Sequence, residues 1–157
     1  MNASDVRTLL RRDHDEIIQL ARDMYESESG DGRRALLKRL KPALINHSRA
    51  EEQEVYEPLL EVRDSEDARD IANEGLVEHG LLDELLERLL RSRKTESDEW
   101  KAHAKVLLEL IEHHVEQEHK HMFLELEEHL ADVEREEMGR RFVAAKARMA
   151  MLKAKAA

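Results

Sequence analysis

The sequence has no cysteine, which excludes disulfide bonds, thiolate nucleophiles and zinc or iron–sulfur sites with cysteine ligands. It also lacks any apolar run near the roughly 20 residues that span a bilayer. The first residues show no basic region followed by a long apolar stretch, so they do not resemble a signal peptide. We therefore expect a soluble, cytoplasmic protein that does not bind membranes.

Helix breakers and aromatic residues are also scarce. The 157 residues include 5 glycines and 2 prolines, and aromatic residues make up 3%. Charged residues reach 39%, and the net charge is −10. This composition is typical of a single helical domain, and the acidic balance disfavours nucleic acid as a partner because it repels polyanions.

Apolar residues recur at helical spacing through most of the chain. They predict an all-α fold, an up-and-down four-helix bundle over residues 1–130 with an additional C-terminal helix over 131–157. Pro42 and Pro58 are expected to bend the second helix or to mark its ends. The fifth helix is expected to pack outside the bundle or to fray, and to be dispensable for metal binding. The four bundle helices are expected near residues 5–26, 33–58, 65–91 and 100–130.

Two histidines are each followed four residues later by a glutamate. This spacing places an imidazole and a carboxylate on one face of a helix, about one turn apart. Two isolated histidines reach the same level, to within about a turn, when the four helices are folded up and down. The predicted metal ligands are His14, His47, Glu51, His79, His114 and Glu118.

Four imidazoles and two carboxylates are too many for one tetrahedral zinc ion, but they suit two ions in a helical bundle. Nitrogen donors combined with oxygen donors favour iron or manganese over calcium and magnesium, which prefer oxygen alone. The alternative is a metal-free polar layer in the bundle core. That alternative is disfavoured because each unpaired buried ion costs several kcal/mol.

At these positions the chain resembles the hemerythrin-like, or HHE cation-binding, domains. The resemblance covers residues from about 5 to 130, and its motifs are specific in combination, although each H-x-x-x-E motif alone is weak. It rests on Leu10-Arg-Arg-Asp-His14, on His47 to Glu52 followed by Val55-Tyr56-Glu57-Pro58, on Glu78-His79, and on His113-His114 through Glu118 followed by Met122-Phe123.

The resemblance implies a non-haem centre of two iron ions with an oxo or hydroxo bridge, manganese being less favoured. Glu51 and Glu118 would bridge the two ions, and the four histidines would be terminal ligands. Family members are associated with binding dioxygen, with sensing oxygen or redox state, with handling peroxide or nitric oxide, and with supplying iron.

One position departs from the family pattern. Oxygen-carrying members usually have a second histidine one turn before the one matched to His79, and here that position is Gly75. Either another side chain enters this volume, or a coordination position stays open. The candidates are His121, which is nearly on the face of His114; His119, which points about 100° away in an ideal helix; and Tyr56, if Pro58 distorts its helix.

The residues therefore favour a protein that reacts with a small oxidant, peroxide or nitric oxide, in redox or oxidative-stress handling. Tyr56 and His121 are the catalytic candidates, although the sequence does not decide whether the chain is an enzyme. A dioxygen-binding carrier or sensor and an iron store or donor are the alternatives. The protein partner and the oligomeric state are not readable from the sequence.

Overall fold

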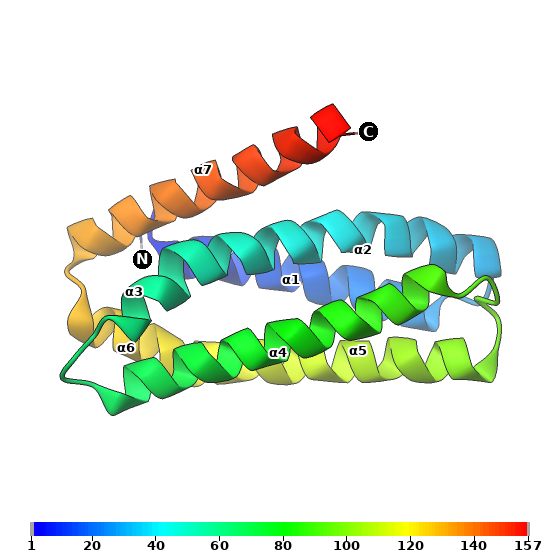
Figure 1. Cartoon of the computed structure of the whole chain (residues 1–157), viewed down its shortest axis with the longest axis horizontal. Helices are drawn as coiled ribbons and strands as arrows, with labels where there is room; N and C mark the ends of the chain where they lie inside the picture. The colour runs from blue at the N-terminus through cyan, green and yellow to red at the C-terminus, as the bar shows by residue number, and fades with distance from the viewer. Residues whose placement is uncertain (1, 157) are drawn as a thin grey trace.

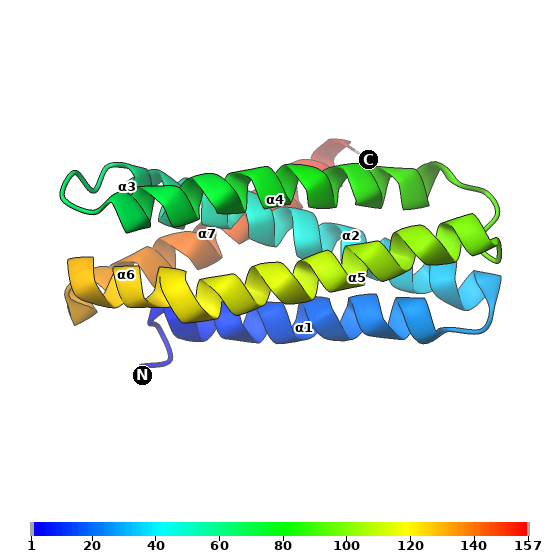
Figure 2. The same cartoon turned by 90° about the horizontal axis from the view of Figure 1, so that it is seen from below.

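A computed structural model describes residues 2–156, with the side chain of Lys153 left out. This part of the chain forms helices and short connections, with no strand. Four long helices run up and down as a bundle, and a further helix lies outside them (Figures 1 and 2). The predicted all-α bundle with an additional C-terminal helix is therefore confirmed. The elements are α1 (Val6–Glu26), α2 (Gly30–Glu51), η1 (Glu52–Tyr56), α3 (Glu57–Leu60), α4 (Glu66–Arg91), α5 (Asp98–Gln117), η2 (Glu118–Met122), α6 (Phe123–His129) and α7 (Asp132–Ala156).

A polar side chain caps the start of each bundle helix. Asp5 accepts a hydrogen bond from the Arg7 amide in α1, and serines do the same at the starts of α2, α4 and α5. Such caps satisfy amides that have no partner inside the helix. The cap of α2 is Ser29, so this helix begins three residues before the predicted Arg33.

Pro42 lies inside α2 and does not end it. The departure from regular α-helix falls instead at two π-helical segments, η1 and η2, which follow α2 and α5 directly. Pro58 lies in the short helix α3, which continues from η1. The sequence analysis did not predict either π segment.

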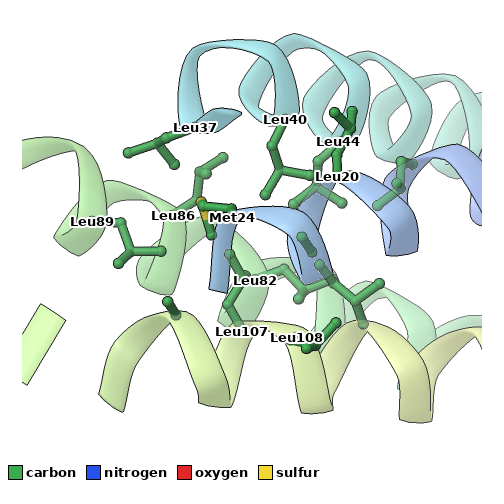
Figure 3. Packing of buried hydrophobic residues seen from close by; sticks show 14 of the residues in the cluster. Leu20, Met24, Leu37, Leu40, Leu44, Leu82, Leu86, Leu89, Leu107 and Leu108 are labelled. Carbon is green, nitrogen blue, oxygen red and sulfur yellow. The ribbon is translucent and has the colours of Figure 1, made fainter. Parts of the chain in front are cut away.

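Two apolar clusters fill the bundle. One lies toward the end where α1 meets α2 and where α4 meets α5, and Figure 3 shows its leucines and Met24 interdigitating. The other occupies the opposite half and includes Val55, Phe123 and Phe142. Along every bundle helix, the predicted ligands lie between residues of the first cluster and residues of the second.

Helix α7 packs along the outside of α1 and α2 (Figure 1). Three of its side chains, Met138, Phe142 and Ala145, are buried in the second apolar cluster. Gly139 allows a close approach, because a Cβ atom there would lie 2.0 Å from the Ser4 carbonyl oxygen. Of the two expectations for this segment, packing outside the bundle is the one observed. Across the described helices, none combines the length and apolar character needed to cross a membrane.

Candidate metal centre

The six predicted ligands meet in the middle of the bundle, and all are buried. The Nε2 atoms of His14 and His47 are 3.1 Å apart, and those of His79 and His114 are 3.2 Å apart. Each pair forms a three-donor group with Glu51. The bundle therefore holds two adjacent groups of donors that share one carboxylate.

Both carboxylates contact both histidine pairs. Glu51 Oε2 lies 3.3 Å from His47 Nε2 and 3.5 Å from His79 Nε2. Glu118 reaches across in the same way, 3.2 Å from His14 Nε2 and 3.6 Å from His114 Nε2. This is the placement that two bridging carboxylates would need.

The outward nitrogen of each histidine has a partner of its own. For three of them this is a carboxylate: Asp13 for His47 at 3.3 Å, Glu52 for His79 at 2.9 Å and Glu78 for His114 at 2.6 Å. His14 Nδ1 lies 3.0 Å from His119 Nε2. A carboxylate can only accept, so these Nδ1 atoms donate outward and the rings are held with Nε2 facing inward.

Neighbouring carboxylates raise the pKa of two of the histidines against the effect of burial. Burial lowers the pKa of His47, but the carboxylates of Glu51 and Asp13 outweigh it and raise that pKa to about 10. The pKa of His79 rises to about 9, because Glu51 and Glu52 outweigh its burial. Burial raises the pKa of Glu51, and the neighbouring histidines bring it well below the usual value. A metal ion bound by these nitrogens would compete with protons for them, so metal binding would depend on pH.

The donor layer fits a pair of metal ions. Two nitrogens on adjacent positions of one ion, each about 2.1 Å from it, would be about 3 Å apart, close to the separation within each histidine pair. Glu51 Oε1 is buried and accepts no hydrogen bond from the described residues, whereas Glu118 Oε2 lies 3.2 Å from His14 Nε2. An unsatisfied buried carboxylate oxygen is costly, and a cation would satisfy Glu51 Oε1. Nitrogen and carboxylate donors together suit a transition metal rather than calcium or magnesium.

Tyr56 fills the volume beside Gly75. A Cβ atom on Gly75 would lie 2.5 Å from the phenol carbon and oxygen of Tyr56. The phenol donates a hydrogen bond to Glu118 Oε1 and lies 3.5 Å from Glu51 Oε2. Burial raises its pKa well above the usual value, and the carboxylates of Glu118 and Glu51 raise it further. Of the alternatives that the sequence left open, a side chain enters this space, and it is the phenol.

The π segment η1 explains how Tyr56 reaches the site. On a straight α-helix, Tyr56 would face away from His47, because nine residues amount to two and a half turns. A π segment has a wider turn, with hydrogen bonds from residue i to i+5, and this rotates the residues that follow it. The inward rotation was foreseen as an effect of Pro58, whereas the distorted residues are Glu52–Tyr56.

His121 does not belong to the site, which corrects the sequence-based expectation. Its side chain is exposed. Glu54 does not support it either, because this carboxylate pairs with Arg141 at 3.0 Å and with Arg148 at 3.8 Å on α7. The second π segment, η2, includes His119 and His121, and it places His119 against His14 while His121 faces solvent.

His119 is a neutral partner of the site rather than a cation. Burial lowers its pKa, and nearby His14 and Arg11 lower it further, to about 4.

Three outer carboxylates were not singled out from the sequence as partners of the histidines. The signal was present, because each directly adjoins a predicted ligand in the sequence: Asp13, Glu52 and Glu78.

Comparison with known families gives one match. Residues 5–126 match the model of the hemerythrin HHE cation-binding domain. No curated protein and no solved structure matches the chain. The match contains all six predicted ligands and ends before α7 begins.

Proposed function

The chain belongs to the hemerythrin HHE cation-binding family, and from this premise we propose that it is a non-haem di-iron protein that reacts with hydrogen peroxide or nitric oxide. The single observation that carries the proposal is the pair of three-donor groups that share Glu51. Glu118 spans the same two groups from the opposite side. Such a layer supports two ions held side by side by bridging carboxylates, as in other helical bundles.

A reactive role is supported by the residue that stands where a carrier would have another histidine. Gly75 cannot be a ligand, and the phenol of Tyr56 occupies its volume. The missing imidazole leaves the two groups with fewer nitrogen donors than the oxygen-carrying relatives have. Iron with an exchangeable position can react with a small oxidant.

Reduction of hydrogen peroxide to two water molecules takes two electrons and two protons, and a pair of iron ions, when bound, supplies the electrons. Tyr56 holds a proton at its Oη atom, between the carboxylates of Glu118 and Glu51. We propose that this phenol delivers one of the two protons toward the reacting oxidant, with Gly75 leaving the space it needs. Solvent supplies the second proton and the one that restores the phenol. The apolar side chains around it, including Val55 and Ala72, exclude water from this end of the site.

The test of the function starts from the chain loaded with iron under anaerobic conditions. Hydrogen peroxide and nitric oxide consumption are measured with an excess of a chemical reductant, which reduces the iron again after each reaction, beside the absorption spectrum under dioxygen. We expect turnover of at least one oxidant above that of the same concentration of free iron. A reversible dioxygen spectrum without turnover would contradict the proposal and support the carrier alternative.

A Tyr56→Phe variant tests the role of the phenol. We expect it to keep both irons and to consume peroxide about 100-fold more slowly, because positioned proton donors contribute roughly 100-fold or more. His103→Ala is the matched control, since His103 is half-buried on α5, away from the site, and donates to the Glu99 carbonyl of its own helix. An unchanged rate in Tyr56→Phe would show that the phenol is packing alone.

A further inference from the structure

Helix α7 contacts the edge of the candidate metal centre with two side chains that lie one turn apart. Phe142 is buried, with its ring 5.7 Å from the His47 ring and nearly perpendicular to it. Four residues later, Lys146 pairs with Asp13 Oδ2, the atom that lies 3.3 Å from His47 Nδ1. Both contacts of α7 therefore converge on the same predicted ligand.

The Lys146 pair differs from ordinary surface ion pairs. Asp13 is buried, with 5% of its surface exposed, and the side chain of Lys146 is 29% exposed. The Lys146 ammonium also lies 5.5 Å from the centre of the Phe142 ring. An ammonium held between an aromatic ring and a buried carboxylate is fixed in position, whereas exposed pairs contribute little.

The other outer partners are supported from within the bundle. Glu52 pairs with Arg49 at 2.6 Å, Glu78 lies 3.6 Å from His113, and His119 lies 3.3 Å from Arg11. Asp13 is instead supported from α7, outside residues 5–126 that match the family. The donor group of His14 and His47 is therefore supported by α7 through the pair of Lys146 with Asp13. The outer partners of His79 and His114 are supported by residues of the bundle instead.

We propose that Lys146 of α7 is a positioning residue for one half of the metal centre, acting through Asp13 on His47. This inference rests on the proposed function and extends it. A carboxylate that accepts from a ligating histidine fixes the ring and its tautomer, and loss of such outer partners costs about 10- to 100-fold in metal affinity. Lys146 fixes Asp13 in turn, so its loss weakens the His14 and His47 position selectively.

The experiment titrates the metal-free, full-length chain with Co²⁺ as a spectroscopic probe, and then with Fe²⁺ under anaerobic conditions. The affected variant is Lys146→Met, which keeps most of the apolar stem and removes the charge. We expect one equivalent to bind as in the unmodified chain, and the second to bind about tenfold more weakly with an altered Co²⁺ visible spectrum. Lys146→Arg should restore both the affinity and the spectrum.

Arg140→Met is the matched control. Arg140 is exposed on α7 and pairs with Glu137 of the same helix, so its loss should change neither equivalent. Melting of the metal-free variants separates positioning from packing. If Lys146→Met binds both equivalents with unchanged affinity, the inference is wrong. Equal weakening of both equivalents together with a lower melting temperature of the metal-free chain would also overturn it, because α7 would then act only on the fold.

These outcomes are distinct from a failure of the proposed function. If the unmodified chain itself does not bind two ions, the di-metal proposal fails before Lys146 is considered. If the unmodified chain binds two ions and Lys146→Met behaves identically, only the role of α7 is overturned.

Discussion

Gly75 and Tyr56 divide one volume beside the two shared carboxylates. The phenol is buried, and its oxygen lies 2.5 Å from the position that a Cβ atom of residue 75 would take, too close for both to fit without movement. Gly80 lies five residues further along α4, and a Cβ atom added there would stand in open space. The two glycines of one helix therefore offer a matched comparison.

Gly75→Ala is expected to destabilise the metal-free protein by about 1–3 kcal/mol, because the added methyl group displaces a buried ring. Gly80→Ala should stabilise it by about 0.5–1 kcal/mol, because alanine is the better helix former and meets no atom. Urea denaturation of both variants measures the two free energies of unfolding. Similar values for the two would show that Tyr56 moves away from Gly75 at no cost.

The convergence of the six predicted ligands is the part of the candidate site that the sequence could predict at this scale. The H-x-x-x-E spacing of His47 with Glu51, and of His114 with Glu118, places the two side chains in contact because four residues make slightly more than one helical turn. The directions of Tyr56 and His121 could not be predicted in the same way. Both lie in π segments, where the angle per residue differs from that of an α-helix.

At the level of elements, α7 is attached to the bundle at both a polar and an apolar contact. Asp5 caps α1 and also lies 3.3 Å from the guanidinium of Arg135 on α7. Burial raises the pKa of Asp5, but the hydrogen bonds and the charge of Arg7, together with a hydrogen bond from Arg135, outweigh it and lower that pKa below the usual value. Asp5 therefore links α1 to α7 through its ionised carboxylate, which contacts Arg7 on α1 and Arg135 on α7.

Asp5→Asn is expected to keep the cap, because asparagine also caps helices, and to lose about 1 kcal/mol through the charged contacts. A lowered folded-state pKa gives stability that is present above the unfolded value near 4 and is lost as the pH falls below it. The difference from the unmodified chain should therefore be constant at neutral pH and shrink below about pH 4. Denaturation at several pH values measures it, with exposed Asp67→Asn as the control; a difference that grows on acidification would contradict the assignment.

Phe142→Ala is expected to cost about 3 kcal/mol or more, because the ring is 1% exposed and packs against His47. Val143→Ala, at the next position and 46% exposed, should change stability by less than about 0.5 kcal/mol. Thermal and urea unfolding compare the two. Equal and small effects would indicate that α7 is frayed in solution.

These contacts bear on the tail that the sequence suggested is dispensable for metal binding. The tail contributes none of the six predicted ligands, but Phe142 and Lys146 contact His47 and its partner Asp13. The place where α7 packs on the bundle could not be predicted, because the apolar residues of this helix do not form a pronounced stripe along one face. Close approach at Gly139 and long-range pairs such as Arg141 with Glu54 become visible only in three dimensions.

At the scale of the whole molecule, the predicted ligands lie at one height along the bundle axis because of the up-and-down fold, and no single motif would place them there. Helical periodicity and scarce glycine and proline were enough to predict four antiparallel helices, and distances from the connecting turns that agree to within about a turn placed the histidines together. The polar layer then separates two apolar clusters, so its residues are also core residues. Metal binding and stability are expected to be coupled.

The most direct test of the di-iron centre is the metal content of the purified chain after anaerobic loading with iron, measured by elemental analysis beside its melting temperature. We expect two iron ions per chain and a higher melting temperature than in the chelator-treated protein. His47→Ala and Glu118→Ala should lower both values, whereas His103→Ala should lower neither. A correctly folded chain that binds no metal when iron is supplied, or variants that keep both ions, would contradict the central claim.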